Sequence, residues 1–341
     1  MRIALDATYS LGPNLTGIGV YSQKLIHGLE GSYPEDSFSL CYRLKAYLRA
    51  PKPTFKNGHR ALLQPPLPVR SDIFHGLNQR VDRRPSRMVV VTFHDLFVMT
   101  ANYSTAEFRA RFTEQARTAA QNSDLIIAVS SFTAEQIQTL LKVEPSRIRV
   151  IFHGVDLPVE EPEVVREKTI LFVGALQTRK NVVRLIEAFE TLPHDWRLVL
   201  AGAADGYGGP AILARIEASP ARNRIELTGH LSHANLQHLY RRAGIFAFAT
   251  LDEGFGIPVL EAMAYGLPVI TSNRSALPEV AGEAALLVNP YDVEELRSAL
   301  LTLMDDADFR AKLAREGRER AAQFPWSRAV EATHRVYQEL V

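Results

Sequence analysis

Two glutamates, Glu253 and Glu261, stand eight positions apart in the segment Glu253-Gly-Phe-Gly-Ile-Pro-Val-Leu-Glu261. The apolar run Ile245–Ala249 precedes this segment and Val259–Ala264 follows from it, which predicts a buried strand, a glycine-rich loop and a helix. The start of such a helix presents unpaired N–H groups and the positive end of the helix dipole, which suits a phosphate. Carboxylates accept hydrogen bonds from sugar hydroxyls, so the segment indicates a site for a sugar nucleotide. The alternative is that Glu261 stabilises the first helical turn and Glu253 is an exposed loop residue.

Two adjacent cations, Arg179 and Lys180, follow the apolar run Thr169–Val173 and the glycine at position 174. A helical pattern over Val182–Glu190 comes next, so we expect both cations at the carboxyl end of a parallel strand, where open α/β sheets bind ligands. Arg179 can bind phosphate through its planar guanidinium, whereas Lys180 acts as a point charge. We therefore predict that both bind phosphate, with a solvated surface pair as the alternative.

The dipeptide His94-Asp95 ends the expected strand Met88–His94, again at a carboxyl end. An imidazole in this position could face a ligand held in the other half of the chain, with Asp95 fixing its tautomer. The alternative is a hydrogen-bonded histidine at the end of a strand.

A glycine-rich loop over Leu11–Gly19 is expected between the first strand and a helix over Val20–Leu29. Gly17 and Gly19 approach the dinucleotide fingerprint G-x-G-x-x-G, but Ser22 stands where its third glycine belongs. The loop could pack on a diphosphate, and a plain flexible loop is equally consistent with the sequence.

Short β-branched runs alternate with longer amphipathic segments along the chain. The first series of expected strands is Arg2–Asp6, Phe38–Tyr42, Asp72–His75, Met88–His94, Leu125–Val129 and Ile148–Phe152. The second series is Thr169–Val173, Arg197–Ala201, Arg224–Thr228, Ile245–Ala249, Pro268–Thr271 and Ala284–Val288. Continuous apolar strands between helices predict α/β structure with parallel sheets covered on both faces.

The 341 residues are enough for two domains, because a single core seldom grows past about 250–300 residues. An acidic, proline-rich stretch over residues 154–168 lacks helix and strand periodicity and marks the boundary. We expect one Rossmann-like domain over residues 1–155, joined by a final helix over 325–341, and a second over 165–324.

The composition, with 46% hydrophobic and 23% charged residues, is that of a soluble globular protein. No apolar run reaches the roughly 18 residues of a membrane helix, and a single cysteine, Cys41, suits a reducing cytoplasm. Asp306-Ala-Asp308 superficially matches a metal-binding D-x-D motif, but it lies between two helical patterns and is interpreted as an acidic helix cap. We expect neither a metal ion nor a cofactor.

Positive charge gathers between Ser37 and Ser71, where Lys and Arg recur without any acidic residue. The simplest interpretation is a solvated face. The sharper one is a surface that attracts an anionic membrane or a lipid-diphosphate acceptor. Nucleic acid is not expected, because no recognition motif accompanies the charge.

Taken together, these motifs resemble the family-4 retaining glycosyltransferases of the GT-B fold, in particular bacterial polysaccharide and O-antigen mannosyl- or glucosyltransferases. The resemblance covers nearly the whole chain, and the ordered set is far more specific than any one motif. Its members are Thr16-Gly-Ile-Gly19, Asp72-Ile-Phe-His-Gly76, His94-Asp95, Val129-Ser-Ser-Phe132, His153-Gly-Val-Asp156, Val173-Gly174, Arg179-Lys-Asn181, Leu227-Thr-Gly229 and Glu253…Glu261.

The resemblance implies two Rossmann-like domains facing a cleft, the N-terminal one for the acceptor and the C-terminal one for a nucleotide-sugar donor. The last helix would cross back to the N-terminal domain. In the catalytic group, His94 would approach the transferred sugar, Arg179 and Lys180 would neutralise the diphosphate, and Glu253 would hold the donor sugar. Glu261 would hold the ribose hydroxyls. The remaining donor-binding residues, acting largely through backbone groups, would be Gly17, Gly19, Leu231, Phe255, Gly256, Ile257 and Val259.

Two positions depart from the family pattern. Ala175 stands where many relatives carry arginine, so Arg179 would supply that charge. His153 stands where asparagine is common, which we interpret as structural variation near the hinge.

The expected reaction is the metal-independent transfer of a hexose from GDP-mannose or UDP-glucose to a polysaccharide or lipid-linked oligosaccharide, with retention of configuration. The family is described as using front-face return, and the sequence offers no carboxylate nucleophile that would suggest another route. Two alternatives remain open at this point. One is a GT-B sugar-nucleotide 2-epimerase, and the other is a non-catalytic sugar-nucleotide-binding subunit of a polysaccharide assembly complex.

Overall fold

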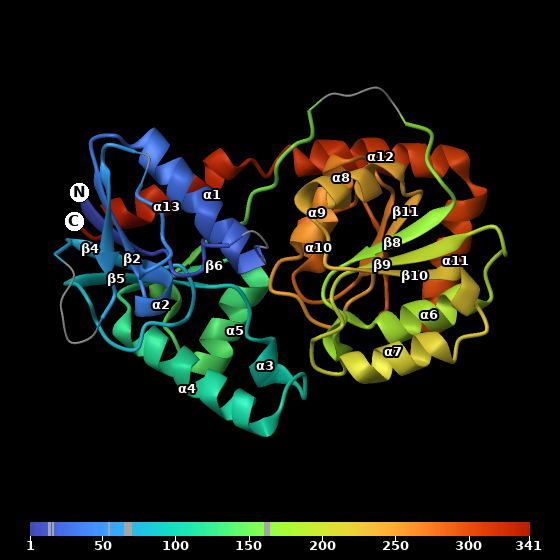
Figure 1. Ribbon diagram of the computed structural model, residues 1–341, viewed down its shortest axis with the longest axis horizontal. Helices are drawn as coiled ribbons and strands as arrows, with labels where there is room; N and C mark the ends of the chain where they lie inside the picture. The colour runs from blue at the N-terminus through green and yellow to red at the C-terminus, as the bar shows by residue number, and fades with distance from the viewer. Residues whose placement is uncertain (13–14, 16, 54, 65–69, 160–163) are drawn as a thin grey trace. The chain divides into compact units, whose positions relative to one another are not determined.

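The computed structural model describes residues 1–341 apart from positions 13–14, 16, 54, 65–69 and 160–163 (Figure 1). The chain folds into two compact units. Unit 1 comprises Met1–Gly154 together with Pro325–Val341, and unit 2 comprises Val155–Phe324. Each unit is built around a parallel sheet, so the predicted α/β class with two parallel sheets is confirmed.

Within the described residues, the sheet of unit 1 has seven parallel strands in the order β3-β2-β1-β4-β5-β6-β7. The strands are β1 (Arg2–Asp6), β2 (Ser37–Tyr42), β3 (Gly58–Leu62), β4 (Ile73–Gly76), β5 (Met88–Phe93), β6 (Leu125–Ala128) and β7 (Ile148–Val150). The helices are α1 (Gly17–Ser32), α2 (Leu44–Tyr47), α3 (Phe97–Thr100), α4 (Ala106–Asn122), α5 (Ser131–Leu141), the 3₁₀ turn η1 (Pro145–Arg147) and α13 (Trp326–Gln338).

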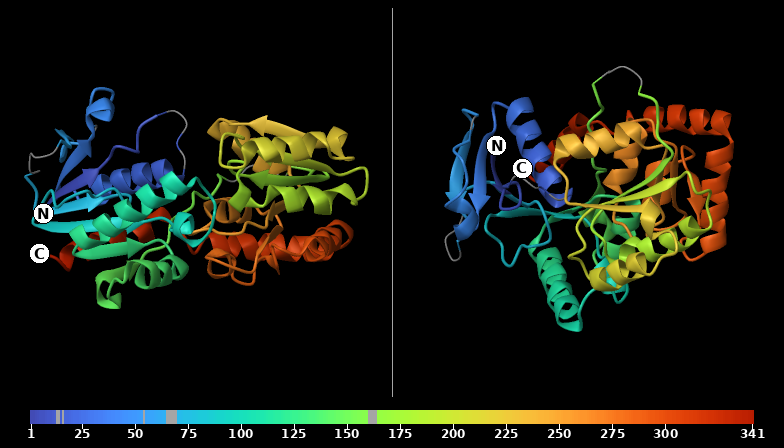
Figure 2. Two further views of the ribbon diagram at one scale, coloured as in Figure 1. Left: turned by 90° about the horizontal axis from the view of Figure 1, so that it is seen from below. Right: turned by 45° about the vertical axis from the view of Figure 1, so that its right-hand side comes forward.

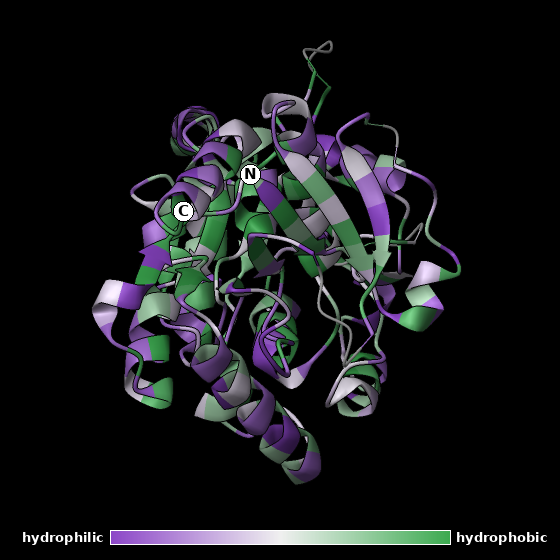
Figure 3. Ribbon diagram, turned by 90° about the vertical axis from the view of Figure 1, so that its left-hand side faces the viewer, coloured by the Kyte–Doolittle hydropathy of each residue, from purple (hydrophilic) through white to green (hydrophobic). Residues whose placement is uncertain are grey.

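Successive side chains of these strands feed two separate cores because they point to opposite faces of the sheet. Ile3 and Leu5 of β1 join the core beneath α1 and α13, whereas Ala4 joins the core beneath α4 and α5. Apolar positions accordingly recur along the strands (Figure 3). Helices lie on both faces of the sheet, and α13 from the end of the chain packs beside α1 (Figures 1 and 2). The approach is close, because a Cβ atom at Gly28 would lie 2.3 Å from Cγ2 of Val330.

In the part of the chain that the structure describes, unit 2 has six parallel strands in the order β10-β9-β8-β11-β12-β13. They are β8 (Thr169–Val173), β9 (Arg197–Ala201), β10 (Ile225–Gly229), β11 (Ile245–Phe248), β12 (Val269–Ser272) and β13 (Leu286–Val288). The helices are η2 (Thr178–Lys180), α6 (Val182–Glu190), α7 (Gly209–Glu217), η3 (Arg222–Arg224), α8 (His233–Arg242), α9 (Ile257–Ala264), α10 (Leu277–Ala281), α11 (Val293–Asp305) and α12 (Ala307–Ala321).

Three sequence-based expectations need correction. The edge strand β3 was not expected, because Gly58–Leu62 is only partly buried and carries no continuous apolar run. The helix expected from Val20 begins at Gly17, so Gly17 and Gly19 are helical residues, and the rest of the expected loop includes positions outside the described residues. Glu261 lies in the second turn of its helix, because α9 begins at Ile257.

The prediction for Asp306 is confirmed. Its carboxylate accepts a hydrogen bond from the backbone N–H of Phe309 at 2.8 Å and caps α12. Among the described residues, no helix combines the length and the apolar character that a membrane span requires.

Candidate functional site

The candidate site lies at the carboxyl edge of the unit 2 sheet, between β8 and β11. The strand order reverses there: β9 and β10 follow β8 on one side, whereas β11 and its successors lie on the other. Ligands of open α/β sheets bind at such switch points. The loop after β8 carries Arg179 and Lys180, and the loop after β11 carries Glu253.

Backbone hydrogen bonds join these two loops. Arg179 accepts a hydrogen bond from the N–H of Leu251 at 2.8 Å, and its Nη1 donates to the carbonyl of Asp252 at 3.0 Å. Asn181 adopts a left-handed conformation with φ of 59°, and its Nδ2 donates to the carbonyl of Ala249 at 2.9 Å. The cation pair is therefore held against the end of β11 by the fold itself.

Arg179, Lys180 and Glu253 form one buried ion cluster. Nη1 of Arg179 and Nζ of Lys180 lie 2.8 and 2.6 Å from the same carboxylate oxygen, Oε1 of Glu253. Lys180 also lies over the ring of Phe248, with Nζ 4.8 Å from its centroid. Burial alone would raise the pKa of the Glu253 carboxyl, but the charges of Arg179 and Lys180 outweigh it and hold that pKa below its usual range. Glu253 is consequently a fixed anion rather than a proton donor.

A glycine at position 256 sets the start of α9 beside this cluster. Its φ of 104° is unfavourable for other residues, and a Cβ atom there would lie 2.5 Å from Cδ2 of Leu277. Pro258 occupies the first turn, where a missing N–H does no harm. The N–H of Val259, expected to help bind the diphosphate, donates instead to the carbonyl of Gly256 at 2.9 Å.

Glu261 stands apart from the ion cluster and has its own partner. The hydroxyl of Tyr240 donates to its Oε2 at 2.9 Å. Burial raises the pKa of Glu261, the charge of Asp156 raises it further, and the hydrogen bond from Tyr240 lowers it. Glu261 and Glu253 therefore form two separate carboxylate positions with different partners.

His94 belongs to unit 1, where it directly follows β5 at the carboxyl edge of that sheet. It is buried, and its Nε2 lies 2.8 Å from the carbonyl of Leu77, so this nitrogen carries the proton. Its Nδ1 lies 3.4 Å from Nε2 of His153, and the two rings stack 14° from parallel. Burial lowers the pKa of His94 to about 4. The carbonyl of Leu77 thus accounts for the tautomer of His94, and the role expected of Asp95 stays a prediction.

The structure brings some of the predicted residues together and leaves others apart. The ion cluster joins Arg179, Lys180 and Glu253. The loop after β11 and the first turn of α9 hold the predicted residues Phe255, Gly256, Ile257 and Val259. The side chain of Phe255 is buried against Phe324, so only its backbone can meet a ligand. Leu231 lies in the loop after β10, at the same sheet edge. Gly17, Gly19 and His94 are in unit 1.

Comparisons with known proteins agree with this geometry. Residues 44–158 match the family model described as Glycosyltransferase Family 4, and residues 157–320 match Glycosyl transferases group 1. O-antigen chain mannosyltransferase B of Escherichia coli is 28% identical, over 98% of this chain and 99% of the relative. The chain belongs to the GT-B glycosyltransferases.

Further relatives extend the match. MMP alpha-(1->4)-mannosyltransferase of Mycolicibacterium hassiacum is 32% identical, over 67% of this glycosyltransferase and 57% of the relative. Among solved structures, sucrose-phosphate synthase from Thermosynechococcus elongatus has a TM-score of 0.77 at 20% identity and covers 100% of this chain and 99% of its own. Anabaena HepE in complex with UDP-glucose has a TM-score of 0.76 at 18% identity, covering 99% and 100% respectively. These two structures share the fold.

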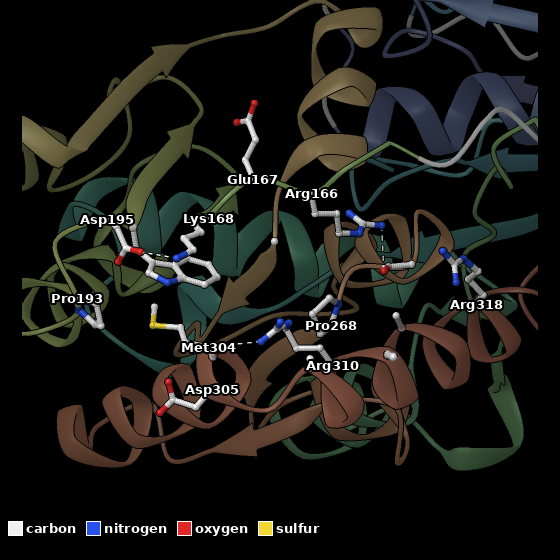
Figure 4. A pocket seen from close by; sticks show the side chains of 16 residues that line it. Arg166, Glu167, Lys168, Pro193, Asp195, Pro268, Met304, Asp305, Arg310 and Arg318 are labelled. Atoms are coloured by element: carbon white, nitrogen blue, oxygen red, sulfur yellow. Dashed lines mark hydrogen bonds and ion pairs between the residues drawn. The ribbon is translucent and has the colours of Figure 1, made fainter.

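A cavity of about 600 Å³ lies at the opposite, amino edge of the same sheet (Figure 4). Its cations serve the fold of the glycosyltransferase. Arg166 donates to five backbone carbonyls, Arg310 binds the last carbonyls of α11, and Lys168 pairs with Asp195. The carboxyl edge is therefore the stronger candidate for the site.

Two residues that hydrogen-bond the glutamates of the site escaped the sequence analysis. Tyr240 sits on α8, in a polar amphipathic pattern that marks a helix and nothing more. Ser275 accepts a hydrogen bond from the N–H of Glu253 through its Oγ at 3.2 Å and carries a left-handed φ of 56°. The burial of Tyr240, which only the structure reveals, is what singles it out, because a buried tyrosine hydroxyl needs a partner.

Proposed function

We propose that this glycosyltransferase transfers a hexose from a nucleoside diphosphate sugar to a polysaccharide or lipid-linked oligosaccharide, with retention of configuration and without a metal ion. The observation that carries the proposal is the buried cluster in which Arg179 and Lys180 share Oε1 of Glu253 at the switch point of the sheet. The names of two relatives, both mannosyltransferases, support mannose as the sugar and GDP-mannose as the first donor to test, with UDP-glucose as the second.

The charge of the cluster suits a diphosphate. The buried Lys180 and the partly buried Arg179 face one carboxylate, so the three side chains carry a net positive charge in a region of low dielectric. A departing nucleoside diphosphate develops negative charge, and groups already in place to stabilise it lower the barrier without reorganising. Arg179 and Lys180 would do this in place of a metal ion.

Glu253 would orient the transferred sugar. Both cations bind Oε1, and the second carboxylate oxygen, Oε2, would accept a hydrogen bond from a sugar hydroxyl. Because its pKa is held low, Glu253 would remain an acceptor at neutral pH. The departing diphosphate would help to deprotonate the acceptor hydroxyl.

The test is release of nucleoside diphosphate from a panel of sugar nucleotides in the presence of an oligosaccharide acceptor. We expect Lys180→Ala to lower the rate by about 10²–10³. Lys168→Ala, which removes an exposed lysine paired with Asp195 at the amino edge, is the matched control. Full activity of Lys180→Ala would overturn the assignment. Turnover without acceptor, giving an isomeric sugar nucleotide, would indicate an epimerase, and donor binding without turnover would indicate a binding subunit.

We further propose that unit 1 docks on an anionic membrane through the basic stretch between Ser37 and Ser71. The supporting observation is that Leu44 and Leu48, in and after α2, are 54% and 76% exposed beside the exposed Lys45 and Arg49. Apolar side chains next to cations suit an interface of lipid tails and acidic headgroups, worth about 1 kcal/mol per cation.

Co-sedimentation with phosphatidylglycerol vesicles tests this docking. Binding should weaken with salt and should fall when Leu44 and Leu48 are both changed to serine. Equal binding to neutral vesicles, or none to acidic ones, would refute it.

A further inference from the structure

Tyr240 places a buried hydroxyl against the carboxylate of Glu261. Only 2% of this tyrosine is exposed, and its hydroxyl donates to Oε2 of Glu261 at 2.9 Å. The ring is held between neighbours: it stacks on Tyr265 at 5.5 Å and 12° from parallel, and it lies 5.9 Å from Phe246. Because its ring cannot move, Tyr240 donates its hydroxyl hydrogen bond to this one acceptor.

The charged surroundings of Glu261 make this hydrogen bond important. Among the described residues, no cation pairs with Glu261, unlike Glu253, which has two. The groups that face it are Tyr240 from α8, Tyr265 directly after α9 and Asp156 from the segment before β8. Arg241 lies over the ring of Tyr265. Burial and the charge of Asp156 both raise the pKa of Glu261, and the hydroxyl of Tyr240 opposes them.

We propose that Tyr240 is a positioning residue that fixes Glu261 so that its other oxygen, Oε1, meets the vicinal hydroxyls of a ribose, which makes the donor pocket selective for ribonucleotides. This inference rests on the proposed binding of a nucleoside diphosphate sugar and on the ribose contact that the family resemblance implies for Glu261, and it adds Tyr240 as the residue that positions that carboxylate. A site that hydrogen-bonds a substrate hydroxyl rejects the analogue that lacks it, because buried polar groups are then left unpaired.

The hydrogen bond also determines the pH range of binding. An ionised carboxylate accepts strong hydrogen bonds from the ribose hydroxyls, whereas a protonated carboxyl is a weaker acceptor. Without the hydroxyl of Tyr240, burial and Asp156 act unopposed, so Glu261 would take up a proton at a higher pH. Affinity for a ribonucleotide should therefore begin to fall at a higher pH in Tyr240→Phe than in the wild type.

The experiment measures dissociation constants of GDP, UDP and their 2′-deoxy analogues by calorimetry between pH 5.5 and 8.5. The wild type should prefer the ribonucleotide, and Tyr240→Phe should weaken ribonucleotide binding by roughly tenfold while leaving deoxynucleotide binding nearly unchanged. Tyr265→Phe is the matched control, because it removes a hydroxyl from the same stack without removing the donor to Glu261. It should keep the wild-type preference.

A double variant separates positioning from a general structural effect. If Tyr240 acts through Glu261, Tyr240→Phe should add nothing to Glu261→Gln, whereas a structural loss would add to it. The inference is overturned by a Tyr240→Phe protein with unchanged preference and pH profile, by additive losses, or by a variant that does not fold. Absence of any nucleotide binding by the wild type would instead refute the proposed function.

Discussion

Lys180 and Glu253 form a buried ion pair, with Nζ 2.6 Å from Oε1 and only 8% and 7% of the two residues exposed. They come from loops after different strands, β8 and β11, and Arg179 binds the same oxygen. The pair thus joins the two sides of the switch point. It holds in one structure the two cations proposed to bind the diphosphate and the carboxylate proposed to bind the sugar.

Removing the anion of this cluster should destabilise the protein. In Glu253→Gln, Arg179 and Lys180 would face each other in a buried site without a counter-charge, and breaking such a pair costs about 3–5 kcal/mol. A nucleoside diphosphate brings negative charge back, so it should raise the melting temperature of this variant more than that of the wild type. Thermal unfolding with and without GDP or UDP measures this. Glu167→Gln is the control, because Glu167 is a half-buried, ion-paired carboxylate at the amino edge of the same sheet. An equal ligand-induced rise in melting temperature in both variants would contradict the cluster model.

Unit 1 should lose stability in mild acid. Burial lowers the pKa of His75 to about 3 and that of His94 to about 4, whereas both would titrate near 6.5 when unfolded. The unfolded chain therefore binds more protons between about pH 6.5 and 4, and the free energy of unfolding should fall as pH falls, by about 1.4 kcal/mol per pH unit for each histidine. Urea unfolding at several pH values measures the slope.

The contribution of His75 can be isolated in His75→Asn. The free energy of unfolding of this variant should fall less steeply as the pH falls, by the contribution of one histidine, which is about 1.4 kcal/mol per pH unit. This difference in slope does not depend on the absolute stability of the variant. Replacing the exposed His233 by asparagine is the matched control. A slope equal in all three proteins would show that the buried histidines are not the cause.

Much of the fold could be predicted because the strands of both units are apolar runs whose ends are marked by glycine, proline or charge. The edge strand β3 could not, since Gly58–Leu62 is held by its ladder to β2 and not by burial of its own side chains. Each motif of the site could be assigned to the correct strand end. What no local pattern reveals is that Lys180 and Glu253, which are 73 residues apart, share an oxygen, or that Tyr240 reaches Glu261.

The C-terminal helix should be weakened by the loss of its buried hydrogen bond to His75. The hydroxyl of Tyr337 in α13 lies 2.6 Å from Nδ1 of His75 in β4, and neither residue is exposed. In Tyr337→Phe the imidazole nitrogen loses its partner, which costs about 1–3 kcal/mol. The melting temperature should fall, and limited proteolysis should cut near α13 sooner. Glu339→Gln breaks an exposed pair with Arg149 and should change stability by less than about 1 kcal/mol. Equal effects of the two changes would contradict this account.

Gly256 should be required for both stability and nucleotide binding. Alanine would have to adopt a φ of 104° and would place its Cβ atom 2.5 Å from Leu277, so backbone strain of about 1–3 kcal/mol adds to a steric clash. Relief of that strain would shift the start of α9 and with it the loop that carries Glu253, so GDP and UDP should bind more weakly as well. Chemical unfolding and calorimetry test the two effects on the same protein.

Gly31→Ala is the matched control, since that glycine lies in α1 with open space around it and alanine favours a helix by up to about 1 kcal/mol. A Gly256→Ala protein as stable as Gly31→Ala, with unchanged affinity, would show that the left-handed turn is not needed to build the site.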